Sequence, residues 1–158
     1  MAIFQNAPLW LGIFAICFAQ FLKVPIYFIA TKKIDWSYLT TTGGMPSSHS
    51  AAVMAVTTAI GFETSFDSPV FAVAAMMAGI VMYDATGIRF QAGKHATLLN
   101  EMRDDMNAFF VEIKRWPALN PDEKREDLKT LLGHKKSEVF FGALTGIFVS
   151  VVYYMIVR

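Results

Sequence analysis

The sequence has little cysteine and little charge. Cys17 is the single cysteine, which excludes an internal disulfide framework and a cysteine metal cluster, and we expect no metal and no cofactor. Charged residues make up only 17% of the 158 residues, against about 25% in ordinary globular chains. The net charge of +1 decides nothing about nucleic acid by itself, and we expect no such partner. The N-terminal residues also lack the basic region and cleavage site of a signal peptide, so we expect the first apolar run to be retained.

Apolar residues, in contrast, make up 54% of the chain, and its mean hydropathy is +0.41. A membrane span needs about 20 mostly apolar residues. Four segments approach this length: residues 8–30, 50–62, 69–83 and 139–157. The second and third are short, so each would extend into its flanking motif or form a re-entrant helix. We therefore predict an all-α, multi-pass membrane protein, a helical bundle of about four transmembrane helices in a single domain, residues 1–158.

Basic residues set the predicted orientation. Lys32 and Lys33 lie in the first connection, and the long third connection, residues 84–136, holds most of the remaining charge. Lysine and arginine near the ends of spans favour the cytoplasmic side of a membrane. We therefore expect these two connections on the cytoplasmic side and both termini on the other side.

The third connection contains a predicted helical insert, residues 94–132. Apolar residues recur with helical spacing between residues 95 and 116, and Pro117 ends that pattern. Asn120 and Pro121 are typical of a helix start, and Gly133 of a helix stop, so a second short helix should end near residue 132. The insert is thus predicted to add two cytoplasmic amphipathic helices. The apolar positions of the first are Leu98, Leu99, Met102, Met106, Phe109, Phe110 and Ile113.

Residues 43–49, with the sequence Gly-Gly-Met-Pro-Ser-Ser-His, indicate an anion site at a helix start. Two glycines permit a tight turn, and Pro46 fits the beginning of a helix. Ser47, Ser48 and His49 would then lie in the first turn, where unpaired N–H groups and the helix dipole favour phosphate. An ordinary serine-capped helix is the alternative interpretation of this run alone.

Three further polar features should lie at the same membrane face. Arg89 follows the third span and offers a planar fork for phosphate oxygens. His134 and Glu138 are four residues apart, so on one helix the carboxylate would fix the imidazole tautomer. Lys23 is the only charge in the first span, and such a charge usually faces a partner or a polar cavity. A local ion pair or an interfacial anchor is the alternative for each feature.

Together these residues resemble the divergent branch of the type 2 phosphatidic acid phosphatase and vanadium haloperoxidase superfamily. Residues 46–49, Pro-Ser-Ser-His, are similar to its Pro-Ser-Gly-His motif. Arg89 is similar to the arginine of its third motif, and His134 with Glu138 to the histidine and the acid of that motif. Lys23 is the best match for the lysine of its first motif. The resemblance covers residues 20–147.

The sequence departs from that pattern in two places. No arginine-proline pair follows Lys23, and the insert separates Arg89 from His134. His95 has the family's usual spacing from Arg89, but Leu99, four residues later, cannot orient an imidazole, so we favour His134. Family members commonly have more membrane helices, which either the insert or a second subunit in a homo-oligomer would supply.

The resemblance implies a metal-independent phosphatase that acts on a lipid phosphate or a polyprenyl pyrophosphate. The histidines and the acid would be catalytic, through a phosphohistidine: His134 as nucleophile, His49 as leaving-group acid and Glu138 to orient the nucleophile. The substrate-binding residues would be Lys23, Ser47, Ser48 and Arg89. Two alternatives remain open: a non-catalytic relative that binds or moves a phosphorylated lipid, and a structural membrane protein whose insert docks a soluble partner. Nothing in the sequence positively favours halide oxidation.

Overall fold

In a computed structural model of the chain, residues 2–113 and 133–157 are described, and they form only helices and the segments that connect them. This confirms the all-α prediction. The predicted second helix of the insert, near residues 120–132, lies outside the described residues. The helices are α1 (Ala7–Thr31), α2 (Ser48–Thr64), α3 (Pro69–Thr86), α4 (Ile88–Ile113) and α5 (Lys136–Val157), with short 3-10 turns η1 (Ala2–Gln5) and η2 (Trp36–Leu39).

Polar caps and prolines set where the first three α-helices begin. Asn6 caps α1 by accepting the N–H of Leu9 at 3.0 Å. Ser47 caps α2, and Ser68 caps α3 just before Pro69. Each cap satisfies an N–H group that has no partner inside its own helix. The short second segment therefore extends into the motif, as one of the two sequence alternatives predicted.

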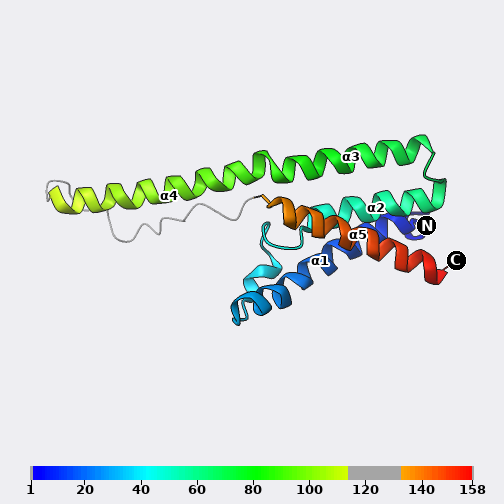
Figure 1. Cartoon of the computed structure of the whole chain (residues 1–158), viewed down its shortest axis with the longest axis horizontal. Coiled ribbons are helices and arrows are strands. Elements are labelled where there is room, and N and C mark those ends of the chain that lie inside the picture. The colour runs from blue at the N-terminus through cyan, green and yellow to red at the C-terminus, as the bar shows by residue number, and fades with distance from the viewer. Residues whose placement is uncertain (1, 114–132, 158) are drawn as a thin grey trace.

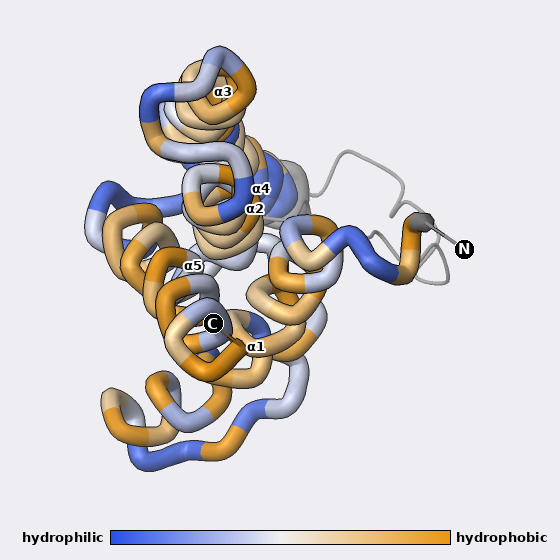
Figure 2. Tube along the Cα trace, turned by 90° about the vertical axis from the view of Figure 1, so that its right-hand side faces the viewer, coloured by the Kyte–Doolittle hydropathy of each residue, from blue (hydrophilic) through white to orange (hydrophobic). Residues whose placement is uncertain are grey.

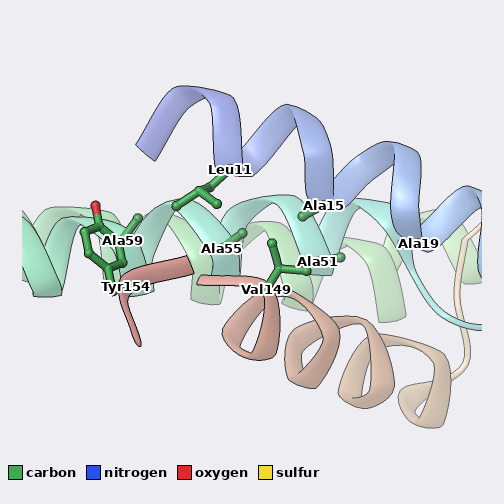
Figure 3. Packing of buried hydrophobic residues seen from close by; sticks show 8 residues of the cluster. All are labelled: Leu11, Ala15, Ala19, Ala51, Ala55, Ala59, Val149 and Tyr154. Carbon is green, nitrogen blue, oxygen red and sulfur yellow. The ribbon is translucent and has the colours of Figure 1, made fainter. Parts of the chain in front are cut away.

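Helix α2 lies at the centre of a bundle, between α1 and α5, with α3 against its outer side (Figure 1). The core consists mainly of small residues: Figure 3 shows alanines of α1 and α2 facing one another while α5 contributes larger side chains. Both chain ends lie at one end of the bundle (Figure 1). The labelled core residues are Leu11, Ala15, Ala19, Ala51, Ala55, Ala59, Val149 and Tyr154.

Two glycines let α5 touch the backbone of α2. A side chain at Gly142 would collide with the carbonyl oxygen of Ser47, and one at Gly146 with the carbonyl oxygen of Ala51. Close approach of small residues is typical of helix pairs in membranes, because dispersion contacts replace the hydrophobic effect there. This contact fixes the start of α5 against the start of α2.

The outer surface of the bundle is apolar. In Figure 2, hydrophobic residues recur around α1, α3 and α5, whereas the connecting turns carry the hydrophilic residues. Within the described residues, three helices are long and apolar enough to cross a membrane: Ala7–Thr31, the continuous Pro69–Asn107 and Lys136–Val157. Helix α2 has 17 residues and runs back through the bundle between them. The chain is therefore a multi-pass membrane protein, with three full-length candidate spans and a shorter, enclosed fourth helix.

Helices α3 and α4 form one nearly straight rod that extends beyond the bundle (Figure 1). The only interruption is Gly87, whose N–H donates to the carbonyl oxygens of Tyr83 and Asp84. The sequence predicted the insert helix from about residue 95, but α4 begins at Ile88 and passes residue 94 without a break. The rod explains the difference, because the helical turns of α3 continue almost directly into those of α4.

Candidate active site

The start of α2 lies at the end of the bundle opposite the chain termini. Gly44 has a φ of +87°, which favours glycine in the turn that leads into the helix. The Ser47 hydroxyl accepts the N–H of Ser50 at 3.3 Å, and the Ser47 N–H donates to the carbonyl oxygen of Glu138 at 2.9 Å. The helix itself begins at Ser48, one residue later than the sequence predicted. His49 is thereby fixed in the first turn of α2.

His134 and Glu138 form the predicted contact, but not on one helix. His134 lies just before α5 begins, and its Nδ1 is 3.1 Å from Oε2 of Glu138. The same carboxylate oxygen accepts the N–H of Lys135 at 3.1 Å. The His134 side chain is buried, and its Nε2 has no hydrogen-bond partner among the described residues. One imidazole nitrogen is therefore held by a carboxylate while the other is left without a partner.

The chain closes the gap between Arg89 and His134 by returning to the junction of α3 and α4. Gly133, with a φ of +78°, packs so tightly on Arg89 and Phe90 that a side chain there would strike their backbone. The N–H of His134 then donates to the carbonyl oxygen of Ala85 at 2.9 Å. Residues that the insert separates in sequence thus become neighbours at one point of the fold.

The start of α2 with its preceding loop, the start of α4 and the residues just before α5 enclose a cavity of about 160 Å³. It is lined by Thr42, His49, Arg89, Gly133 and His134. The rings of His49 and His134 have centroids 6.0 Å apart and are inclined at 61°. A second cavity of about 180 Å³ shares His49 and Arg89 and has Ile80, Val81, Asp84 and Ala85 of α3 as its other walls. Two imidazoles and a guanidinium therefore line one small space, beside a mostly apolar one.

Arg89 also has a local partner, as the alternative interpretation of its motif required. Its Nε lies 2.6 Å from Oδ2 of Asp84, and both side chains are partly exposed. Asp84 contacts Nε, and the two terminal nitrogens of the guanidinium have no partner among the described residues. Asp84 and Thr42 are the polar wall residues that we did not select as site residues. Asp84 could have been selected, because it opens the motif that ends at Arg89.

The predicted serines and Lys23 do not line either cavity. Ser47 and Ser48 are buried where α2 begins. Lys23 is buried on α1, where its Nζ donates to the carbonyl oxygens of Thr41 at 3.0 Å and Gly43 at 2.8 Å. Lys23 therefore holds the loop that carries Thr42 and does not itself form a wall of the cavity.

We expect Lys23→Met to act mainly on stability. The substitution removes the two hydrogen bonds that the buried ammonium group donates to the carbonyl oxygens of Thr41 and Gly43. Hydrogen bonds to charged groups contribute about 1.5–3 kcal/mol each. Thermal unfolding in detergent should show a clear loss of stability, whereas Lys33→Met, at an exposed position, should show almost none. If Lys23→Met unfolds like the wild type but binds orthovanadate much more weakly, Lys23 is an anion ligand and the supporting role is wrong.

The described residues contain no group of three or more histidine, cysteine, aspartate or glutamate side chains that could hold a metal ion. His95, the competing histidine of the sequence, is exposed on α4 and lines neither cavity. Of the candidate residues, His49, Arg89 and His134 therefore line the first cavity.

A family model described as the Divergent PAP2 family matches residues 4–149, which is most of the chain. The chain belongs to the Divergent PAP2 family. It is also 51% identical over 152 residues to the membrane protein YuiD of Bacillus subtilis (strain 168), a match that covers 96% of each chain. No solved structure matches it. The resemblance that the motifs indicated is thus confirmed at the level of the family, and this Divergent PAP2 protein has its motif residues at one end of a membrane bundle.

Proposed function

We propose that this chain is a membrane-embedded phosphatase that hydrolyses a lipid phosphate or a polyprenyl pyrophosphate without a metal ion. The observation that supports it best is the buried Nε2 of His134, which has no partner among the described residues while Glu138 holds Nδ1. Burial of an unpaired polar atom costs free energy, so such an atom in a cavity wall is a candidate to meet a ligand. Its neighbours in that wall, His49 and Arg89, are groups that a phosphate ester would need.

In the proposed first step, Nε2 of His134 attacks phosphorus and the bond from phosphorus to the leaving oxygen breaks. Glu138 keeps the imidazole in the tautomer whose Nε2 carries the lone pair. His49 gives a proton to the leaving oxygen, which departs as an alcohol or as a prenyl phosphate. Arg89 stabilises the charge that develops on the phosphoryl oxygens, and the start of α2 adds the positive end of its dipole.

In the second step, water attacks the phosphohistidine and His49 takes up a proton from that water. The bond between phosphorus and Nε2 breaks, inorganic phosphate leaves, and His134 returns to its starting state. One imidazole thus serves as acid and then as base, which requires it to lie close to the reacting atoms throughout. The cavity that His49 shares with His134 satisfies this requirement.

We further propose that this end of the bundle faces the cytoplasm. Lys32 and Lys33 follow α1 at this end, and Lys135 and Lys136 lie where α5 begins. Lysines close to the ends of spans favour the cytoplasmic side. The substrate phosphate would then be reached from the cytoplasmic leaflet.

The test uses purified protein in lipid vesicles with phosphatidic acid or a polyprenyl pyrophosphate as substrate. We expect phosphate release that continues in EDTA and that orthovanadate inhibits, because vanadate resembles the pentacoordinate phosphorus of the transition state. Activity that EDTA abolishes would contradict the proposal. Orthovanadate binding without phosphate release from either substrate would instead favour the second candidate function, a non-catalytic relative that binds or moves a phosphorylated lipid. The ion pair between Asp84 and Arg89 is compatible with that function, because it leaves Arg89 at the cavity wall.

A further inference from the structure

Helix α4 carries an apolar stripe that has no role in the proposed chemistry. Its large members are each more than half exposed, from 51% for Met102 to 75% for Ile88. The stripe recurs at alternating steps of four and three residues along the helix. Its described positions are Ile88, Ala92, His95, Leu99, Met102, Met106 and Phe109. We call these seven positions the α4 seam.

The spacing of the α4 seam is that of a coiled coil. Alternating steps of four and three average 3.5 residues, which keeps one stripe facing a partner helix that supercoils with it. A helix that packs on an irregular surface has no need of so regular a repeat. The repeat covers almost the whole of α4, which has 26 residues, more than three heptads.

The direction of α4 excludes the membrane as the partner of the seam. The rod of α3 and α4 runs continuously over 39 residues from Pro69 to Asn107, a length of about 58 Å. The hydrocarbon core is only about 30 Å thick, and the rod continues the line of α3 away from the bundle (Figure 1). Most of α4 therefore projects into water, where an exposed apolar stripe of this length calls for a protein partner.

A second stripe of α4 is less exposed than the seam. The less exposed residues of α4 are Phe90, Gly93, Ala96, Asn100 and Arg103, and Gly133 packs at Phe90 where the chain returns. None of these five positions belongs to the α4 seam. The large seam residues Ile88, Leu99, Met102 and Met106 are exposed and therefore available to another molecule.

We infer that two copies of this chain pair through their α4 seams as a parallel, in-register coiled coil. Copies in one membrane share one orientation, so their α4 helices project side by side from the same face, at a high effective concentration. In this register Leu98 of one copy lies beside Arg103 of the other, and Gln91 lies beside Ala96. His95 meets its own copy in the seam, and a polar seam residue favours a single register.

Cysteine cross-linking tests the register directly, because the chain has only Cys17 to remove. In a Cys17→Ser background, Met102→Cys and Met106→Cys each place a thiol in the seam. Asp104→Cys lies between them along the helix but on the opposite face. A disulfide requires Cα atoms within about 7 Å, so mild oxidation in vesicles should link the seam variants at least about tenfold more than the control. Equal linking of all three variants, or none in any, would overturn the pairing.

A second measurement keeps the inference independent of oxidation. The Met102→Asp, Met106→Asp double variant should lower the mass in detergent from two chains to one, because charges in the seam repel across the pair. Its unfolding temperature should change little, since both positions are exposed. The inference would be contradicted if the wild-type protein is already monomeric in detergent and the cysteines of the Met102→Cys and Met106→Cys variants do not react with a soluble maleimide. That combination would show that the seam is covered within one chain. Neither measurement depends on phosphatase activity.

Discussion

His134→Ala should lower phosphate release from a lipid phosphate at least about 10³-fold, because no other described residue of the cavity has a buried nitrogen that lacks a partner while its ring is held by a carboxylate. The loss should be in kcat, since Arg89 and His49 remain to bind the phosphate. The measurement is the initial rate of phosphate release in vesicles. A labelled phosphate group that stays on the wild-type protein in base and is lost in acid would be direct evidence of a phosphohistidine. The mutant should bind orthovanadate without forming that label.

His95→Ala is the matched control for this prediction. His95 has the family's spacing from Arg89 in sequence, but it is exposed on α4 and outside the cavity. Its replacement should lower the rate less than about tenfold, because His95 lines neither cavity and therefore does not touch the reacting groups. If His95→Ala abolished turnover and His134→Ala did not, the assignment of the nucleophile would be wrong.

The second large effect concerns folding. Gly146→Leu should destabilise the protein by at least about 3 kcal/mol, because even the first side-chain atom would overlap the carbonyl oxygen of Ala51 and crowd the backbone of Ala55. Helices α2 and α5 would have to separate, and the Glu138 carbonyl would lose the N–H of Ser47. We expect poor accumulation in membranes and a large fall in unfolding temperature in detergent.

Gly79→Leu provides the comparison on α3. No atom lies within 4 Å of the position that a side chain would occupy there, and the residue is exposed on the outer surface of the bundle. Leucine is also a better helix former than glycine by about 1 kcal/mol or less, so this variant should be as stable as the wild type or slightly more. Equal destabilisation by the two substitutions would mean that α2 and α5 do not pack through Gly146.

The site connects to this packing through α5. Gly142 and Gly146 bring α5 onto α2, Ser47 donates to Glu138 across the same contact, and Glu138 orients His134. A change in the helix contact should therefore shift His134 as well as weaken the fold. This is why stability and activity need to be measured together in every variant of the α2–α5 contact.

The sequence by itself determined the class of the protein and the approximate positions of its apolar helices. Hydropathy and helix-start signals are local properties, so the apolar runs near α1, α3 and α5 could be predicted from neighbouring residues, and the start of α2 to within one residue. The predicted topology put His49, Arg89 and His134 at one face, because the first and third connections lie on the same side of the membrane. It underestimated α4, since nothing in the sequence near Gly87 shows that α3 would continue in line.

Only the tertiary structure decided which residues form the cavity. Lys23 looked like an anion ligand, but the loop of Thr41 and Gly43 folds over it and takes its hydrogen bonds. Arg89 and His134 are far apart in the sequence. They line one cavity because Gly133, which has no side chain, can pack directly against the backbone of Arg89 and Phe90 at the start of α4. Such contacts depend on how segments distant in sequence approach one another, and no local pattern of residues contains that information.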